Sequence, residues 1–417
     1  MDGRATGREA LSNAGAAGCS SVIPPFELGR LPRIVFGPGS RTRLPGLAAG
    51  YGRRILLVTG ARSLRASLHG RALHESFRGH GLEVHGLVVQ GEPSPGLVDE
   101  AVRMHRPRGI EVVVGIGGGS ALDAAKAIAG LLPSGRSVMD HLEEVGQGVP
   151  YEGPSTPFIA APTTAGTGSE ATRNAVLTES GPQGFKRSFR NEALVPEWAV
   201  VDPDLLETCP LPLVAADGFD ALTQLLESYV SRHAGPVTDA LAEHGLAAAR
   251  DGLLPWYEGT GDVRASRASM AYAALISGIT LAHAGLGVVH GLSAPLGAFF
   301  EIPHGAACGT LVAAATAANV RALRARDPEN AALVRYGRAW AILASEPNEP
   351  VPEDAPERLV ALLDDWTRRL EQPRLGTFGV GEDDVARLVE SGRAGSTKSN
   401  PIALEDHETA GILGARI

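Results

Sequence analysis

The stretch Ile110-Glu111-Val112-Val113-Val114-Gly115-Ile116-Gly117-Gly118-Gly119-Ser120-Ala121-Leu122-Asp123-Ala124-Ala125-Lys126 decides the fold of this chain. Its first residues are mostly apolar and β-branched, which predicts a buried strand over residues 110–115. The glycines that follow let the backbone turn sharply, and the alanine-rich segment after them predicts a helix. A helix start in this position offers unpaired N–H groups and a positive dipole end, with Ser120 suited to the N-cap. We therefore expect an anion-binding turn, although a plain tight turn fits the same residues.

Strands and helices alternate on both sides of this turn. Short apolar runs at 54–60, 82–89 and 157–161 predict further buried strands, and helical patterns occupy 95–104 and 121–132. Alternation of this kind predicts a parallel sheet with helices on both faces, an α/β domain.

The pattern changes after Pro203. Apolar residues now recur at helical spacing over 214–230, 236–254, 264–283 and 311–324, and strand signals nearly vanish. We therefore expect three parts: a flexible tail over 1–25, an α/β domain over 26–202, and an all-helical domain over 203–417.

The composition excludes several classes of protein. The chain has 417 residues with 38 basic and 47 acidic side chains, a formal net charge of −9, and 5% aromatic residues. It lacks the basic excess and the stacking aromatics of a nucleic-acid binder. The three cysteines are too few and too widely spaced for a disulfide framework, which favours the cytoplasm. No apolar run predicts a membrane span.

A second polar loop follows the strand predicted at 157–161. It reads Pro162-Thr163-Thr164-Ala165-Gly166-Thr167-Gly168-Ser169-Glu170 and is dense in hydroxyl groups. A loop at the carboxyl end of a parallel strand lies where α/β folds bind ligands, so these hydroxyls are suited to a ribose or a phosphate. The alternative is a capped helix start. Two such loops in one domain favour a dinucleotide.

Acidic and imidazole side chains lie in apolar surroundings of the helical half. Asp220 lies inside an apolar helix with Gln224 one turn later, and His290 and His304 are flanked by glycine. One carboxylate and two imidazoles are suited to a divalent metal with an open position for substrate. The alternative is that each His is an ordinary hydrogen-bonded core residue.

Four ordered motifs together resemble the iron-containing (group III) alcohol dehydrogenase family. They are Ile116-Gly117-Gly118-Gly119-Ser120 with Asp123, Ala125 and Lys126; Pro162-Thr163-Thr164 with Gly168-Ser169-Glu170; Gly218-Phe219-Asp220-Ala221-Leu222-Thr223; and His290-Gly291 with Pro295-Leu296-Gly297 and Pro303-His304-Gly305. The resemblance runs from residue 26 to the end. It implies a Rossmann-like dinucleotide-binding domain and a helical domain, the fold that dehydroquinate synthases share.

The resemblance also implies roles for single residues. The pyrophosphate of NAD(P)(H) would lie on the glycine-rich turn, and Asp220, His290 and His304 would hold zinc or iron as the catalytic centre. The residues implied for the cofactor are Gly117, Gly118, Gly119, Ser120, Asp123, Thr163, Thr164, Thr167 and Lys186.

The chain departs from the family pattern at the metal ligands. Members with iron place a fourth ligand, histidine, four residues after the aspartate, where this chain has Gln224. The ligand set is therefore closer to the glycerol dehydrogenase branch, which binds zinc with one Asp and two His. Gln224 remains a possible weak ligand.

Two further departures concern the proton path and the cofactor. A second histidine that members use in proton relay is Ala294 here, which leaves water, a cofactor hydroxyl or His283. The acidic residue that bonds the adenosine ribose in NAD-preferring members is Gly60 here, and Arg62 is available to a 2′-phosphate. This favours NADP(H) weakly.

The sequence thus predicts a metal-dependent NAD(P)-linked alcohol dehydrogenase, or aldehyde or ketone reductase, acting on a small molecule as a homodimer or higher oligomer. We expect Phe299, Phe300 and the region of Asn174 to line the substrate pocket. One alternative is a lyase or cyclase like dehydroquinate synthase, for which only Lys398 and Arg232 are candidate phosphate ligands. Another is a nicotinamide-binding protein that has lost catalysis.

Overall fold

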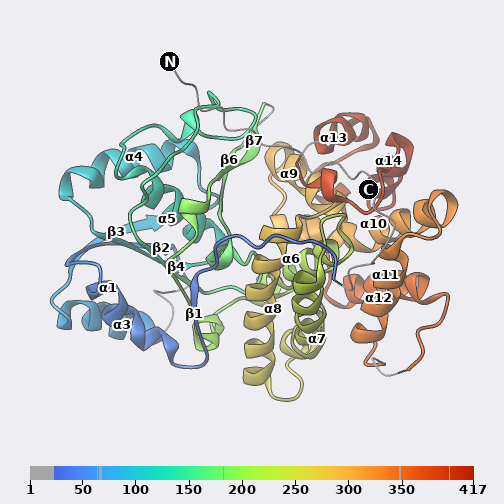
Figure 1. Cartoon of the computed structure of the whole chain (residues 1–417), viewed down its shortest axis with the longest axis horizontal. Helices are drawn as coiled ribbons and strands as arrows, with labels where there is room; N and C mark the ends of the chain where they lie inside the picture. Colours follow the sequence, from blue (N-terminus) through green and yellow to red (C-terminus); the bar gives the residue numbers. More distant parts are fainter. Residues whose placement is uncertain (1–22, 63, 65–67, 182, 347–348, 394) are drawn as a thin grey trace.

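A computed structural model describes residues 23–62, 64, 68–181, 183–346, 349–393 and 395–417. The molecule has a strand-containing half and a helical half, side by side (Figure 1). Of the predicted tail, residues 1–22 lie outside the described part, and residues 23–25 are exposed.

The first half is built on a parallel sheet of six strands. Their order is β1-β8-β5-β4-β2-β3. The strands are β1 (Arg33–Phe36), β2 (Arg54–Gly60), β3 (Glu83–Val89), β4 (Val112–Gly117), β5 (Phe158–Pro162) and β8 (Trp198–Val201). All four strands predicted from the sequence are present, so the predicted parallel sheet is confirmed. The two that the sequence did not predict, β1 and β8, have four residues each, too few to show a pattern.

Helices cover both faces of this sheet. Successive side chains of β2 alternate between two cores: Ile55 and Leu57 pack with α1 (Leu44–Ala49) and α3 (Leu68–Gly79). Leu56 and Val58 pack on the other face with α4 (Pro95–His105) and α5 (Gly119–Leu131). The strands are apolar on both faces because neither face meets water.

The order of the strands reverses at β2. The chain runs from β2 outward to β3, and then returns to form β4 on the other side of β2. The carboxyl ends of β2 and β4 therefore border a crevice, the place where open α/β sheets bind ligands. The glycine-rich turn lies at this point.

An antiparallel hairpin leaves the sheet between β5 and β8. It consists of β6 (Asn174–Glu179) and β7 (Phe185–Arg190). Strand β6 packs on α5 and β7 packs on α9, so the hairpin spans from one half of the molecule to the other (Figure 1).

The second half consists of helices packed around α6. They are α6 (Leu211–Val230), α7 (Pro236–Glu258), α8 (Val263–Ala284), α9 (Val288–Phe300), α10 (His304–Arg326), α11 (Ala331–Leu343), α12 (Ala355–Arg369), α13 (Val385–Gly392) and α14 (Asp406–Gly414). By length and hydropathy α10 would be able to cross a membrane, but 83% of its most apolar window is buried inside the protein. Cys209 and Cys308 are both free thiols.

Candidate active site

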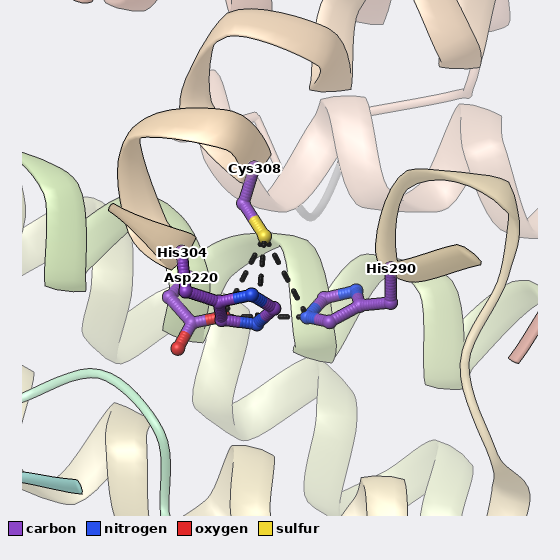
Figure 2. A group of neighbouring side chains, drawn as sticks. All are labelled: Asp220, His290, His304 and Cys308. Atoms are coloured by element: carbon purple, nitrogen blue, oxygen red, sulfur yellow. Dashed lines mark hydrogen bonds and ion pairs between the residues drawn. The ribbon is translucent and has the colours of Figure 1, made fainter. Parts of the chain in front are cut away.

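Four side chains with metal-binding atoms meet in the helical half (Figure 2). They are Asp220 on α6, His290 on α9, and His304 and Cys308 on α10, and their ligand atoms lie within 4.8 Å of one another. The Oδ1 atom of Asp220 is 3.3 Å from Nε2 of His290 and 3.5 Å from Nε2 of His304. The first three were predicted from the sequence motifs, and Cys308 was not. Its signal was the spacing of four residues after His304, which places both side chains on one face of a helix.

Local structure fixes these side chains in place. Asp220 lies in the middle of a helix whose residues from Gly218 to Val230 are all buried. His304 is the first residue of α10, directly after Pro303, and Cys308 follows one turn later. His290 lies in the first turn of α9. Three separate helices therefore converge on one buried point.

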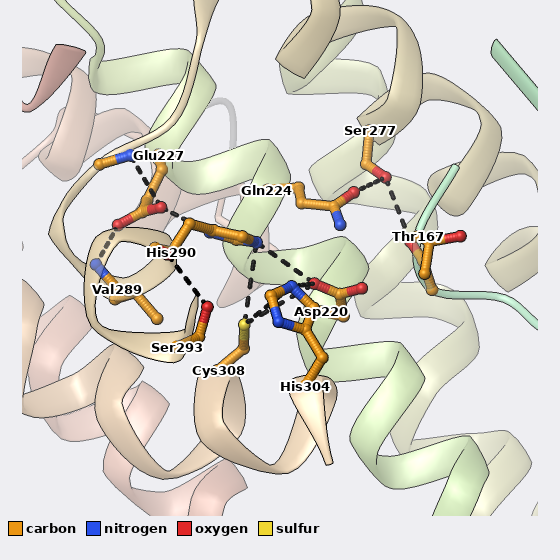
Figure 3. A network of polar contacts seen from close by, with 12 residues as sticks. Thr167, Asp220, Gln224, Glu227, Ser277, Val289, His290, Ser293, His304 and Cys308 are labelled. Atoms are coloured by element: carbon orange, nitrogen blue, oxygen red, sulfur yellow. Dashed lines mark hydrogen bonds and ion pairs between the residues drawn. The ribbon is translucent and has the colours of Figure 1, made fainter. Parts of the chain in front are cut away.

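Glu227 orients His290 through the ring nitrogen that points away from Asp220 (Figure 3). Its Oε2 accepts a hydrogen bond from Nδ1 of His290 at 2.7 Å and from the backbone N–H of Gly287 at 2.9 Å. Its Oε1 accepts from the backbone N–H of Val289 at 2.7 Å. The contact with Nδ1 leaves Nε2 of His290 directed toward Asp220, with its lone pair free for a metal. No sequence pattern points to this carboxylate, because the contact joins α6 to the start of α9, about 60 residues away in the chain.

The cluster has unusual proton affinities. Burial lowers the pKa of His304 to about 4, so its ring is neutral at neutral pH. Burial also opposes protonation of His290, but its electrostatic interaction with Cys308 and its hydrogen bonds to Asp220, Cys308 and Glu227 raise its pKa well above the ordinary value. Burial raises the pKa of the Cys308 thiol to about 11.

The structure corrects the assignment of Gln224 as a possible ligand. Its Oε1 accepts a hydrogen bond from the Ser277 hydroxyl at 2.7 Å (Figure 3). Burial raises the pKa of Asp220, but the charge of His304, the contacts with His290 and, least, a hydrogen bond from the Gln224 amide outweigh burial and lower this pKa. An amide oxygen would repel the carboxylate in that place, so the amide nitrogen faces the cluster.

The glycine-rich turn is as tight as the sequence predicts. A Cβ atom on Gly117 would lie 3.1 Å from the backbone nitrogen of Gly60, and one on Gly119 would lie 2.5 Å from Cγ2 of Thr167. Gly118 occupies the N-cap of α5 without a side-chain cap. The assignment of Ser120 as the N-cap was wrong, because the helix begins at Gly119, two residues earlier than predicted, and Ser120 lies in its first turn. Its hydroxyl faces Glu92 at 3.4 Å.

Asp123 and Lys126 tie α5 to the second polar loop. The carboxylate of Asp123 accepts hydrogen bonds from the Ser169 hydroxyl at 2.6 Å and the Val176 N–H at 3.2 Å. The buried ammonium of Lys126 donates to the Ser169 carbonyl at 2.8 Å and the Thr172 hydroxyl at 2.8 Å. Asp123 thus supports the glycine-rich turn from within α5, and the two loops form one unit.

The second polar loop also packs against the helical half, and at this contact no side chain lies between the two main chains. A Cβ on Gly278, in the middle of α8, would lie 2.2 Å from the carbonyl oxygen of Gly168. Gly168 has a positive φ of 59° and would itself bring a Cβ to 2.5 Å from Gly278 Cα. Nothing larger than hydrogen fits at either position.

One cavity joins the glycine-rich turn to the metal cluster. It has a volume of about 400 Å³ and is lined by Gly118, Gly119 and Ser120 at one end and by Asp220, His290 and His304 at the other. Asp123, Thr164, Thr167, Asn174, Lys186 and Ala294 line it as well.

A groove of about 1140 Å³ continues from this cavity past Gly118 and Thr163 to Gly60 and Arg62. Of the residues predicted to bind the cofactor, all but the fully buried Gly117 line the cavity or the groove.

Glu92 and Lys186 stand between the cavity and the groove. The Lys186 ammonium lies 3.2 Å from the Glu92 carboxylate. Although burial opposes ionisation, the charge of Lys186 lowers the pKa of Glu92. Glu92, which lies in a turn between Gly91 and Pro93, stands in none of the motifs and was not predicted.

Several predicted residues lie elsewhere. Phe299 and Phe300 pack against the core under α13 and α14 rather than lining the cavity. His283 lines a separate hollow with Glu27 and Arg30, so it is not the proton relay.

The candidate phosphate ligands for the lyase alternative are also outside the cavity: Arg232 lines a different hollow, and Lys398 does not line the cavity. The arginines that do line it, Arg187 and Arg190, are paired with Glu144 and Glu143.

Comparison with known proteins agrees with this geometry. The family profile described as "Iron-containing alcohol dehydrogenase" matches residues 32–203, and "Fe-containing alcohol dehydrogenase family, C-terminal" matches residues 214–417. The chain belongs to the iron-containing alcohol dehydrogenase family. It is therefore an oxidoreductase of the metal-dependent alcohol dehydrogenase type, in agreement with the function predicted from the motifs.

Among members of this family, the NAD-dependent methanol dehydrogenase of Bacillus methanolicus is 31% identical over 395 residues, covering 92% of this chain and 97% of that protein. The NADPH-dependent butanol dehydrogenase of Clostridium saccharobutylicum is 29% identical, covering 92% and 96%. The solved structure of a 1,3-propanediol oxidoreductase has a TM-score of 0.83 at 28% identity, covering 94% of this chain and 100% of that one. The predicted two-part fold is confirmed.

Proposed function

We propose that the cavity is the active site of an NAD(P)-linked alcohol dehydrogenase or carbonyl reductase whose metal ligands include Asp220, His290 and His304. The observation that carries the proposal is the single cavity with the glycine-rich turn at one end and these three side chains at the other. On this proposal residues 26–202 bind the cofactor, and residues 203–417 bind the metal and a small alcohol, aldehyde or ketone.

The three side chains fit a divalent metal. Nε2 of each histidine lies close to the same carboxylate oxygen, and the neutral ring of His304 needs no deprotonation to coordinate. A divalent ion held there supplies Lewis-acid polarisation of the substrate oxygen. Glu227 orients His290 in the way that carboxylates orient metal-bound histidines elsewhere. The closer likeness to the glycerol dehydrogenase branch stays a prediction.

The turn and the groove fit a dinucleotide. The amides at the start of α5 face the cavity with no side chain in the way, because the first residues there are Gly118 and Gly119. Such amides bind pyrophosphate. Thr163, Thr164 and Thr167 place hydroxyls beside them, and the groove continues to Arg62.

Lys186 would contact the ribose next to the nicotinamide, which supplies or accepts the hydride. It reaches the boundary between cavity and groove from the hairpin strand β7. The absence of a carboxylate at Gly60 and the presence of Arg62 in the groove favour NADP(H). The named relatives include both an NAD-dependent and an NADPH-dependent enzyme.

The residues that line the cavity indicate how the proton of the substrate hydroxyl leaves the site. Ala294 lines the cavity where many members have histidine, and the one other candidate, His283, faces elsewhere. We infer that water or a cofactor hydroxyl carries the proton.

The experiment that tests this proposal measures the absorbance of reduced nicotinamide with a series of short alcohols and aldehydes, together with the metal content. Asp220→Ala and His304→Ala should each lose bound metal and turnover. His283→Ala is the matched control, because it removes an imidazole outside the cavity and should retain both. Wild-type turnover in both cavity variants would refute the assignment. Absence of turnover with every substrate and metal would favour a protein that binds nicotinamide without catalysis.

We also propose that the protein forms a homodimer or a higher oligomer through the edge of its sheet. Strand β1 is an edge strand, and Ile34 and Phe36 on it are 42% and 41% exposed, beside exposed Leu28 and Leu31. Exposed apolar side chains on a strand that has no second neighbour among the described residues favour association. Light scattering of wild type and Phe36→Lys tests it, since the variant should shift toward monomer.

A further inference from the structure

Cys308 lies at the metal cluster but has no role in the family pattern. Its Sγ atom is 3.7 Å from Oδ1 of Asp220, 3.8 Å from Nε2 of His290 and 3.9 Å from Nε2 of His304 (Figure 2). The side chain is completely buried. The sulfur therefore faces all three proposed ligand atoms at once and faces no water.

These distances match the edges of a coordination tetrahedron. With Zn–S bonds of about 2.3 Å and Zn–N or Zn–O bonds of about 2.0–2.1 Å, tetrahedral angles place sulfur about 3.6 Å from each other ligand and the lighter ligands about 3.3 Å apart. The observed separations are 3.7–3.9 Å for sulfur and 3.3–3.5 Å for the Asp–His pairs. These five of the six edges come within a few tenths of an ångström of the values for zinc, and all four atoms lie within 4.8 Å of one another.

The residue that ought to supply the fourth ligand is occupied elsewhere. Gln224 stands where members with iron have histidine, and its amide oxygen is hydrogen-bonded to Ser277. Cys308 approaches the cluster from α10, one turn after His304, a spacing that suits two ligands of one metal. The other three cluster residues line the substrate cavity and Cys308 does not. A metal bound by all four would therefore face the cavity with its Asp220, His290 and His304 side, and would expand to five-coordination there to take a substrate oxygen.

We propose that Cys308 is the fourth metal ligand of this protein, that it takes the place of the histidine missing at position 224, and that it makes the site selective for zinc over iron(II). The inference rests on the proposed metal site. On binding, the thiol releases its proton to solvent and the resulting thiolate forms the bond to the metal. Thiolate ligands favour zinc, whereas carboxylate and imidazole alone leave iron competitive.

X-ray absorption of the zinc-loaded full-length protein tests the proposal without relying on turnover. We expect one sulfur scatterer at about 2.3 Å beside nitrogen and oxygen scatterers at about 2.0–2.1 Å. Cys308→Ser should lose the sulfur scatterer and weaken zinc binding at least about 100-fold, since loss of an outer partner alone costs 10- to 100-fold. Cys209→Ser is the matched control, because it removes a thiol outside the cluster and should keep the sulfur scatterer.

The outcomes separate this inference from the proposed function. A wild-type protein that binds one zinc through Asp220 and shows no sulfur scatterer overturns the role of Cys308 and leaves the metal site intact. Equal affinity for iron(II) and zinc overturns the claimed selectivity. Wild-type protein that binds no zinc, like Asp220→Ala, refutes the metal site and the inference together.

Discussion

Replacing Glu227 by glutamine should weaken metal binding although Glu227 is not itself a proposed metal ligand. The carboxylate accepts three hydrogen bonds, from Nδ1 of His290 and from the N–H groups of Gly287 and Val289. Glutamine keeps one acceptor oxygen and turns the other into a donor. If the oxygen stays on the His290 side, the Val289 N–H faces an NH₂ group and is left buried without an acceptor. Zinc affinity should then fall about 10- to 100-fold, the usual effect of losing such a partner.

The stability loss follows from the same contacts. One unsatisfied buried N–H costs about 1–3 kcal/mol, and two hydrogen bonds that lose their charge cost about 1 kcal/mol each. The free energy of unfolding of Glu227→Gln should therefore fall by about 3–5 kcal/mol. Urea unfolding and a zinc competition assay measure the two effects. Glu243→Gln is the control, because Glu243 accepts from the Tyr229 hydroxyl outside the cluster. Zinc affinity in Glu227→Gln equal to that of the control would refute the orienting role.

Three further predictions concern other parts of the site. Gly119→Ala places a Cβ 2.5 Å from Thr167, so dinucleotide affinity in a calorimetric titration should fall roughly 10- to 100-fold, whereas Gly79→Ala, which meets nothing within 4 Å, should bind normally. Burial raises the pKa of Asp217 to about 8. The folded protein then holds a proton that the unfolded chain has lost, so metal-free protein loses stability as pH rises from about 4 to about 8, and Asp217→Asn should flatten this dependence in urea unfolding. Arg62→Ala should raise the KM for NADPH and leave that for NADH, and an equal effect on both would contradict a 2′-phosphate contact.

Local pattern predicted most of the first half correctly. Strands such as β2 and β4 are buried on both faces, so each appears in the sequence as a continuous apolar run between turn signals. The hairpin β6–β7 was not predicted. Its polar strand Phe185–Arg190 is a strand because it pairs with β6 and packs on α9, and not because of its own residue pattern. Context of that kind leaves no periodic signal in the strand itself.

Site residues that belong to a sequence motif could be predicted. Residues that join the site only through the three-dimensional fold could not. Asp220, His290 and His304 stand in recognisable motifs, and the structure brings them together. Glu227 reaches the same point from a part of the chain that no short pattern connects to His290, whereas Cys308 lies one turn after His304 and stands in none of the four motifs. Gln224 shows the opposite case, since its position suggests a ligand but a hydrogen bond to Ser277 turns its oxygen away.

The contact between Gly168 and Gly278 sets how closely the two halves of the molecule approach each other at this point. Two main chains touch there without an intervening side chain, so the loop that borders the dinucleotide rests directly on α8, which packs on α6, the helix that carries Asp220. At this point the spacing between the two halves is thus set by backbone thickness rather than by adjustable side chains. We expect the halves to keep their spacing here in every state, so that cofactor enters along the open groove and not by separation of the halves. A methyl group at either glycine would push the halves apart and lengthen the path that the hydride must cross.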